Sequence, residues 1–436
     1  MDKSPIDKLV RPVSNFIHLE YTSGLVLFLG VVTAIVWVNS PWAHHYHSLW
    51  ETPLSVGLGG INFKHPLHLW VNDGLMAVFF FVIGLELKRE FMAGELSTVK
   101  KAALPMIAAL GGMLIPAVIY SLVNSHGPGS KGWGVPMATD IAFALAILSL
   151  AGKQIPASIK VFLSALAVAD DLGAVLVIAV FYSGELHFIT LLIGLGILLL
   201  MVAGNSLGVR HTAFYLLLGI AAWVCFLLSG VQATIAGVLA AFTMPARTRV
   251  DEKRYSERLR ELSYEFDAEI PNCSTLTTPH QHETIEHIKA LSLAAQTPLQ
   301  KIETGLHPWV AFIVMPLFAL ANSGIVISQG FFGQLVNPVS LGVIAGLVLG
   351  KLVGVFSFTW LAVKTKLADL PSEGNWRHIL GVAMLAGIGF TMSLFITALA
   401  FKQEELVNQA KYGILLSSLV AGIGGSIILR TAGRKT

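Results

Sequence analysis

Two adjacent aspartates, Asp170 and Asp171, lie in the middle of the segment ALAVADDLGAV, which is otherwise apolar enough for lipid. Neighbouring residues of a helix point about 100° apart, so the two carboxylates cannot share one face and need different partners. A carboxylate that water can reach is a hard oxygen ligand for a proton or for a small cation such as Na+. These two ligands compete for the same lone pairs, and such competition is the chemistry of ion exchange.

Two further charges interrupt apolar segments. Lys351 lies in LVLGKLVGVF with no nearby carboxylate in the sequence, and Asp140 follows Thr139 in GWGVPMATDIAFALAIL. A charge at the centre of a membrane helix costs at least about 2.5 to 3.5 kcal/mol, whereas a folded protein is stable by only about 5 to 15 kcal/mol. We therefore expect these three aspartates and the lysine to have functional roles, with Lys351 as the intramembrane cation that can pair with an aspartate.

The composition indicates a polytopic membrane protein, because 54% of the 436 residues are hydrophobic and only 13% are charged. A helix needs about 20 mostly apolar residues to cross the hydrocarbon core. The chain contains twelve such segments, and they predict an all-α fold with twelve transmembrane helices, near 21–39, 66–86, 102–123, 134–151, 157–182, 188–208, 212–227, 231–245, 308–327, 338–363, 377–400 and 410–429.

Basic residues predict how these helices are oriented. With twelve spans both termini lie on one side, and most of the 29 Lys and Arg residues fall on that side; the exceptions are Lys64, Lys131, Lys402, Lys411 and the intramembrane Lys351. Because cytoplasmic loops are enriched in Lys and Arg, we expect both termini in the cytoplasm. The net charge of +3 reflects this bias and does not indicate a nucleic acid partner.

Two of the segments are predicted to be interrupted helices. Segment 134–151 has Pro136 ahead of its Thr-Asp pair, and segment 377–400 has Gly387 and Gly389 near its midplane. Interruptions at corresponding places in two halves of a chain indicate inverted repeats with a transport site between them. Close helix packing is the alternative explanation for the two glycines.

A broken helix exposes ends whose partial charges favour anions at N-termini and cations at C-termini. Asp140 and Lys351 are available for these roles. Compensation of helix ends therefore competes with direct ion binding as the role of this pair, and the sequence leaves both interpretations open.

Two long connections stand out from a chain that otherwise forms a single transmembrane domain over residues 1–436. LSVGLGGINF (54–63) fits a β-hairpin around Gly59 and Gly60 on the outer side, although a flexible loop fits nearly as well. Residues 246–300 form a polar insertion on the cytoplasmic side, in which two stretches have apolar residues at helical spacing. We expect two helices there, solvated or on the membrane surface, but the sequence does not give their role.

Other classes of site fit the sequence less well. The motifs HHYH and HQHETIEH could bind a metal, but both are expected in loops and lack cysteines; for the second, regulation by protonation is the better hypothesis. An aspartyl protease would need a GxGD motif and a potassium channel a TVGYG-like filter, and neither occurs. An ion-coupled symporter of a small organic substrate is the more serious alternative, although it would need cations or free amides at the midplane.

Five motifs carry a resemblance to a known family: WVNDGLMAVFFFVIGLELKRE, ATDIAFALAIL, ALAVADDLGAV, LHPWVAF and AGIGFTMSLFI. In this order, over nearly all of the chain, they resemble the NhaA-type Na+/H+ antiporters of bacterial inner membranes. This family is itself an example of inverted repeats, so the two interrupted helices do not support the resemblance independently. The resemblance implies electrogenic, pH-regulated exchange of cytoplasmic Na+ or Li+ for external H+, in the service of sodium and pH homeostasis.

The resemblance also implies a role for each site residue. Asp171 would be the principal Na+ ligand, and Asp170 would share the Na+ site and take part in proton exchange, with Lys351 as its partner. Thr139 would lie near the ion, and Asp140 would compensate helix ends together with Lys351.

Further expectations concern regulation and assembly. The pH response is expected at a cluster near the cytoplasmic face, made of Glu86, Lys88, Arg89, Glu90, Glu303 and His307. The family dimerises partly through an outer hairpin, matched here by residues 54–63, so we expect a homodimer in the lipid bilayer. Apart from the transported Na+, Li+ and H+, the resemblance implies no cofactor and no enzyme chemistry. The chain departs from the family in GVQAT, where Gln232 replaces a frequent histidine and removes one titratable group.

Overall fold

The computed structural model describes residues 22–58, 61–152, 154–184, 186–248, 250–269, 276–327, 333 and 335–432. Within these ranges, eight helices are long and apolar enough to cross a membrane, and the three bent helix pairs raise that number to eleven if each is one span. A shorter apolar helix, Thr234–Thr243, completes the predicted twelve. The expectation of an all-α polytopic membrane protein is therefore confirmed.

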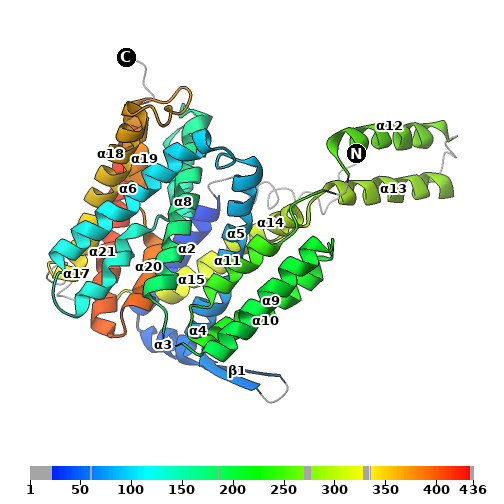
Figure 1. Cartoon of the computed structure of the whole chain (residues 1–436). Coiled ribbons are helices and arrows are strands. Elements are labelled where there is room, and N and C mark those ends of the chain that lie inside the picture. The colour runs from blue at the N-terminus through cyan, green and yellow to red at the C-terminus, as the bar shows by residue number, and fades with distance from the viewer. Residues whose placement is uncertain are drawn as a thin grey trace.

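The described helices follow the predicted segments closely (Figure 1). In chain order the spans are α2 (Thr22–Val38), α4 (Leu67–Leu69) with η1 (Trp70–Leu75) and α5 (Met76–Ala93), α6 (Val99–Val123), η2 (Pro128–Met137) with α7 (Ile141–Ala151), α8 (Ala157–Phe181), α9 (Phe188–Ser206), α10 (Thr212–Ser229), α11 (Thr234–Thr243), α14 (Pro298–Trp309) with η3 (Val310–Val314) and α15 (Met315–Asn322), α17 (Pro338–Ile344) with η4 (Ala345–Gly350) and α18 (Lys351–Lys364), α19 (Trp376–Leu385) with α20 (Phe390–Ala400), and α21 (Glu404–Ala432).

The ninth span differs most from its prediction at its start. The ninth begins at Pro298 and not near residue 308, because Thr297 and Gln300 form a capping box that starts the helix before its apolar part. The hydrophobic pattern alone could not show this polar first part.

Spans three to five and ten to twelve form two units of three, and in each unit the middle span is broken. The axes bend by 44° between η2 and α7 and by 43° between α19 and α20. Corresponding spans lie seven apart in the chain, an odd number, so the two units cross the membrane in opposite directions. The units meet where α6 packs on α18; a Cβ on Gly111 or Gly354 would collide with the backbone carbonyl of the other residue.

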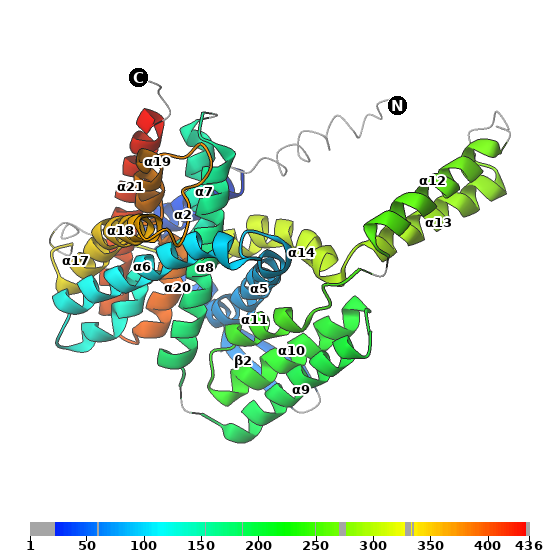
Figure 2. The ribbon, with the colours of Figure 1, turned by 45° about the horizontal axis from the view of Figure 1, so that its top comes forward.

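The remaining spans form a second group beside these units. Helices α9, α10 and α11 lie together at one side of the molecule, away from α18, α19 and α21 (Figure 2). Helix α11 packs closely on α5, because Gly237 allows its backbone to approach Ala77 and Phe81. The short α11 thereby becomes part of the bundle although it has only 10 residues.

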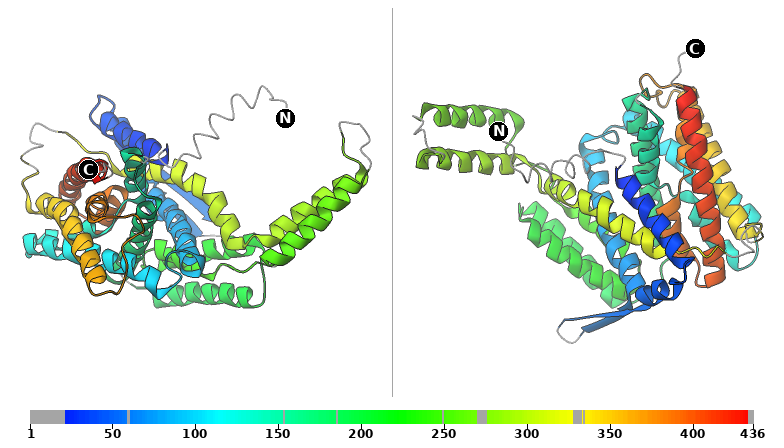
Figure 3. Two further views of the ribbon diagram at one scale, coloured as in Figure 1. Left: turned by 90° about the horizontal axis from the view of Figure 1, so that it is seen from above. Right: turned by 180° about the vertical axis from the view of Figure 1, so that it is seen from behind.

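The loop at 54–63, which we expect on the outer side, forms a hairpin, as predicted. Strands β1 (Pro53–Leu58) and β2 (Ile61–Pro66) pair antiparallel from Pro53–Pro66 to Leu58–Ile61, whereas the turn residues Gly59 and Gly60 lie outside the described residues. Helix α3 (Ala43–Glu51) bends by 114° from α2 and leads into the hairpin, so the HHYH motif lies in a helix and not in a loop. The hairpin lies at the opposite end of the molecule from the last turn of α21 (Figures 1 and 3).

The insertion contains two helices, as expected, namely α12 (Glu252–Ala268) and α13 (Pro279–Ala295). They pack against one another, with Leu262 and Thr284 buried, and project sideways from the spans (Figure 3). The second histidine motif therefore also lies in a helix, α13. Asp251 caps α12 and a Thr278–Gln281 capping box begins α13, so each helix has its own start signal.

Candidate functional site

The two broken spans cross at their breaks. The backbone N–H of Asp140 donates to the carbonyl of Ile388 at 2.6 Å, and the hydroxyl of Ser393 donates to the carbonyl of Val135 at 2.7 Å. Unpaired backbone groups at an interruption are costly inside a membrane, and each broken span here satisfies part of the other. Hydrogen bonds between the two broken spans therefore hold the crossing together.

Asp140 caps both half-helices that begin at the crossing. Its Oδ1 accepts from the N–H of Phe143 in α7 at 3.1 Å, and its Oδ2 accepts from the N–H and the hydroxyl of Thr391 in α20 at 3.0 and 2.5 Å. One carboxylate thus faces two helix N-termini, where unpaired N–H groups and the helix dipole favour negative charge. This geometry suits a residue that compensates helix ends.

Asp170 is bound by two polar groups. Its Oδ2 accepts from the ammonium group of Lys351, and the side chains of both residues are 1% exposed. The hydroxyl of Thr139 lies 2.7 Å from the same oxygen and 2.9 Å from the carbonyl oxygen of Ala386, so it donates to one of them at a time. Lys351 directly follows the π-helical turn η4; such turns often occur at functional sites.

Asp171 has a different environment from its neighbour. It is 1% exposed, and its Oδ1 has no hydrogen-bond partner within the described ranges; the Oδ1 of Asp170 is buried and unpartnered as well. A buried carboxylate oxygen without a partner is costly, and a proton or a hard cation is what satisfies it. The donor chemistry at Asp171 therefore fits Na+ and H+ equally.

The charges around Asp171 favour cations. The groups near enough to act on it electrostatically are Asp170, Asp140, Glu86 and Lys351, which is three carboxylates against one lysine. Since Lys351 is paired with Asp170, negative charge dominates at Asp171. Such a site attracts a proton or a metal cation and repels anions.

The expected cytoplasmic cluster is brought together by α5 and α14. The guanidinium of Arg89 donates to Glu303 Oε1 at 2.5 Å and to Glu90 Oε1 at 3.1 Å, and it lies 3.9 Å from Glu86 Oε1. One guanidinium group is thus within ion-pair distance of three carboxylates. His307 follows Glu303 by one turn of α14.

Lys88 was expected in this cluster but has another partner. Its ammonium group donates to the carbonyls of Phe242 and Met244 at 2.6 and 2.5 Å. These carbonyls belong to the C-terminal end of α11, where a cation satisfies orphan acceptors and the helix dipole. Lys88 therefore fastens the short helix α11 to α5.

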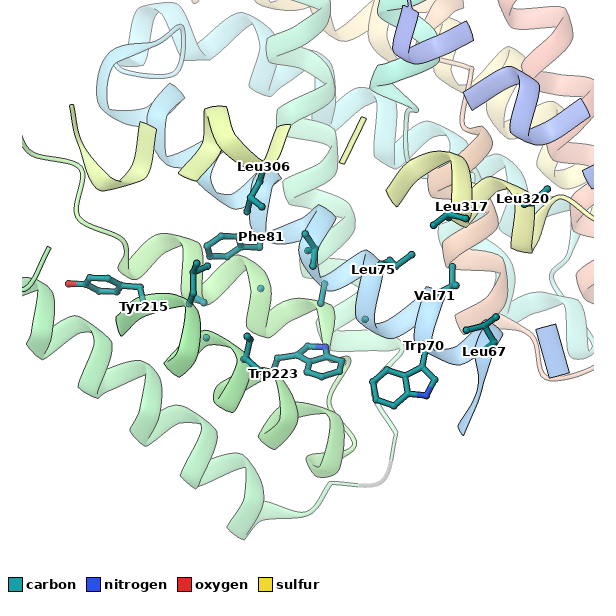
Figure 4. A pocket seen from close by; sticks show the side chains of 18 of the residues that line it. Leu67, Trp70, Val71, Leu75, Phe81, Tyr215, Trp223, Leu306, Leu317 and Leu320 are labelled. Carbon is teal, nitrogen blue, oxygen red and sulfur yellow. The ribbon is translucent and has the colours of Figure 1, made fainter. Parts of the chain in front are cut away.

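A large apolar cavity lies away from these charges. It has a volume of about 740 Å³ between α5, α10, α11 and the ninth span, and its lining includes Trp70, Phe81, Trp223, Leu306 and Leu317 (Figure 4). No charged residue lines it. Such a cavity offers neither ligands for a cation nor a counter-charge for an ionic organic substrate.

One intramembrane acid was missed by the sequence reasoning. Asp73 lies in η1, within the second span, and Gln232 Nε2 is 3.5 Å from its Oδ1. The sequence contains a sign of this acid, because WVNDGLM places an aspartate inside an apolar run. From the sequence alone, we interpret this stretch only as a family motif. Gln232, the residue that departs from the family, is its side-chain neighbour.

Comparison with known proteins agrees with this geometry. A family profile described as Na+/H+ antiporter 1 matches residues 14–429. The Na+/H+ antiporter NhaA of Oleidesulfovibrio alaskensis is 47% identical over 98% of this chain and 95% of its own length. The Na+/H+ antiporter NhaA of Acidithiobacillus ferrooxidans is 47% identical over 98% of this chain and 99% of its own length, and NhaA 2 of Syntrophotalea carbinolica is 46% identical over 98% of both chains. Matches of this extent show that the chain belongs to the Na+/H+ antiporter 1 family.

Proposed function

We propose that the protein is a secondary transporter that exchanges Na+ or Li+ from the cytoplasm for H+ from outside. The observation that carries this proposal is the buried Asp171 carboxylate, whose Oδ1 has no hydrogen-bond partner in the described parts of the chain and which lies beside the crossing of two broken spans. The names of the relatives give the same pair of ions. Transport is driven by ion gradients, so no enzyme chemistry and no organic cofactor are needed.

Exchange follows from competition at one carboxylate. Asp171 holds either a proton or Na+, because both use the same oxygen lone pairs. If the two units reorient only when Asp171 holds either Na+ or a proton, Na+ leaves on one side as H+ enters on the other. Thr139 contributes a hydroxyl near the ion, and Asp140 keeps the two half-helices in place during the movement.

Asp170 and Lys351 supply the second titratable element. When Na+ approaches Asp171, it also competes with the ammonium group of Lys351 for the charge of Asp170. Release of a proton from this pair would add to the proton from Asp171 and make exchange electrogenic. The membrane potential then becomes a drive, because each net charge moved across 100 mV yields about 2.3 kcal/mol.

The pH response is assigned to the inner cluster. Arg89 balances Glu86, Glu90 and Glu303 only in part, so the net charge there changes as protons bind. Glu86 also acts electrostatically on Asp171, which couples the cluster to the ion site. We include His307 in this cluster because it lies one turn after Glu303 in α14. We include Lys88 because its ammonium group holds the end of α11 against α5.

The cellular setting is a bacterial inner membrane with both termini in the cytoplasm, as the distribution of Lys and Arg favours. The outer hairpin, predicted at 54–63, is proposed as part of a homodimer contact. Among the described residues its two short strands form a ladder only with each other, so their outer edges can pair with a second hairpin. The insertion at 246–300 is assigned to the cytoplasmic side.

A symporter of a small organic substrate has no comparable support. The relatives are named antiporters, and the large cavity offers an organic ion no charged partner. Lys351 is a cation at the midplane, but it is already paired with Asp170 and is not available to an organic anion.

Everted membrane vesicles that contain the protein test this function. A preformed pH gradient should partly collapse when Na+ or Li+ is added, and choline should have no effect. Purified protein should release protons when it takes up Na+ at a pH where exchange runs. Uptake of Na+ without proton release at that pH would contradict competition at the carboxylate.

A further inference from the structure

Asp73 is a second acidic site in the membrane, separate from the ion site. It lies in the π-helical turn η1, near the start of the span Leu67–Ala93. Its side-chain contact is the amide of Gln232, 3.5 Å from Oδ1, while the indole N–H of Trp223 donates to its backbone carbonyl at 3.2 Å. A contact of 3.5 Å is at the limit of a hydrogen bond, so the carboxylate is only weakly held.

A small cavity connects Asp73 with the outer surface. The cavity has a volume of about 60 Å³, and His65 and Asp73 line it together with Trp70, Trp223 and Leu227. His65 belongs to the hairpin strand β2 and is exposed, so the cavity reaches the outer face. A cavity of this size has room for water, since one water needs only about 10 to 15 Å³ of such space. Asp73 therefore lines a cavity that opens toward the outer face through His65.

Distance separates Asp73 from the inner cluster. Glu86 lies thirteen residues further along the same span, which corresponds to about 20 Å at 1.5 Å per residue. One span therefore carries a titratable group near each face, Asp73 at the outer end and Glu86 at the inner end. An acid held within a membrane span is costly and is a functional site by default.

We propose that Asp73 is the proton acceptor of the outer face, which collects external protons for exchange and sets the response to external pH. This inference rests on the proposed function of Na+/H+ exchange. The groups that face Asp73 are His65 and His68 from the hairpin end and the neutral Gln232 from the connection before α11. His65 and His68 are the neighbouring side chains that can carry positive charge, whereas Gln232 is neutral and contributes none.

Transport in right-side-out vesicles, with internal pH held constant, tests this role. In Asp73→Asn the external-pH midpoint of exchange should move to lower pH by about one unit, equal to a tenfold change in proton affinity. The internal-pH midpoint, measured in everted vesicles, should stay in place. Asp73→Glu should retain a titratable outer response. Glu51→Gln, which removes an exposed carboxylate next to the hairpin, is the matched control and should shift neither midpoint.

Gln232→His supplies an independent readout, because it places a titratable imidazole against Asp73. The external-pH profile should change in this variant, and the change should disappear when Asp73→Asn is also present. Unchanged external-pH profiles in Asp73→Asn and Gln232→His, with wild-type exchange intact, would overturn the assignment of Asp73. Absence of Na+-driven proton movement in the wild type, in either vesicle orientation, would instead contradict the proposed function itself.

Discussion

Lys351 forms an ion pair with Asp170 at a depth where each side chain is 1% exposed. The close approach of α6 and α18, which needs glycine at positions 111 and 354, brings the lysine to this place. Desolvation of two charges offsets much of their attraction, so such a pair is weak evidence for stability. The presence of this ion pair in the centre of the bundle is better explained by a function in which the pair separates.

Loss of the lysine alone should be strongly destabilising. Lys351→Ala leaves Asp170 buried without its cation, and breaking a buried pair in this way costs about 3 to 5 kcal/mol. The double variant Asp170→Asn with Lys351→Met removes both charges and should recover much of that loss. Melting temperatures of the purified proteins in one detergent provide the measurement. Additive losses in the double variant would show that the two residues do not interact.

Asp171→Asn should abolish exchange without unfolding the protein. The amide keeps the size of the side chain but loses the charge that binds a cation and the site that accepts a proton. Na+ should then fail to collapse a pH gradient in everted vesicles, while the amount of protein in the membrane stays normal. Asp369→Asn, at an exposed position outside the spans, is the control. Undiminished Na+-driven proton movement in Asp171→Asn would refute this site.

Asp140→Ala should weaken the fold more than it weakens the ion site. It removes the caps of two helices, α7 and α20, each of which contributes about 1 kcal/mol. Asn337→Ala removes the cap of one helix, α17, and should lower the melting temperature about half as much. Exchange in Asp140→Ala should persist with a raised KM for Na+. Complete loss of transport in a normally stable protein would instead place Asp140 among the ion ligands.

The sequence predicts the twelve spans, the two interruptions and the hairpin, because each depends on local signals. Hydrophobic runs of sufficient length give the spans, and glycine or proline near a midplane gives the breaks. The acidic pair Asp170–Asp171 and Lys351 stand out for the same reason, since charges are rare in such runs. Local composition was therefore enough to single out the residues to which we assign the ion site.

Contacts between distant segments were beyond this kind of reasoning. The residues themselves showed only that Asp170 and Asp171 need different partners; the family resemblance implied Lys351 as the partner of Asp170, and the structure brings these two side chains together. Lys88 looked like a member of the acidic cluster, yet its ammonium group meets the end of α11. The sequence could not show that Asp73 lies beside Gln232, because the two residues are far apart along the chain.

Arg89→Gln should shift the pH response. Without the guanidinium, Glu86, Glu90 and Glu303 face one another uncompensated, which favours protonation of at least one of them. The pH at which exchange is half-maximal should therefore rise, while the maximal rate changes little. Arg258→Gln breaks an exposed ion pair with Glu261 on α12 and should leave the midpoint unchanged. A midpoint that stays fixed in Arg89→Gln would remove this cluster from the pH response.

Removal of the helical insertion tests whether it regulates exchange. Its ends lie side by side, since the N–H of Leu299 donates to the carbonyl of Pro245 at 3.2 Å, so a short Gly-Ser linker can replace residues 251–295. The capping box of Thr297 and Gln300 remains, and α14 should still start correctly. Helices α12 and α13 pack on each other, away from Asp171, so the maximal rate should persist in reconstituted vesicles.

The pH profile of this deletion variant is the informative quantity. Three histidines, His280, His282 and His287, lie in α13, and histidine gains charge as pH falls through the neutral range. If they regulate exchange, the deletion should move the pH midpoint, and replacement of all three by glutamine in the full chain should reproduce that shift. Identical profiles in all three proteins would show that the insertion has no role in pH sensing. Loss of exchange in a folded deletion variant would show that the insertion supports the ion site.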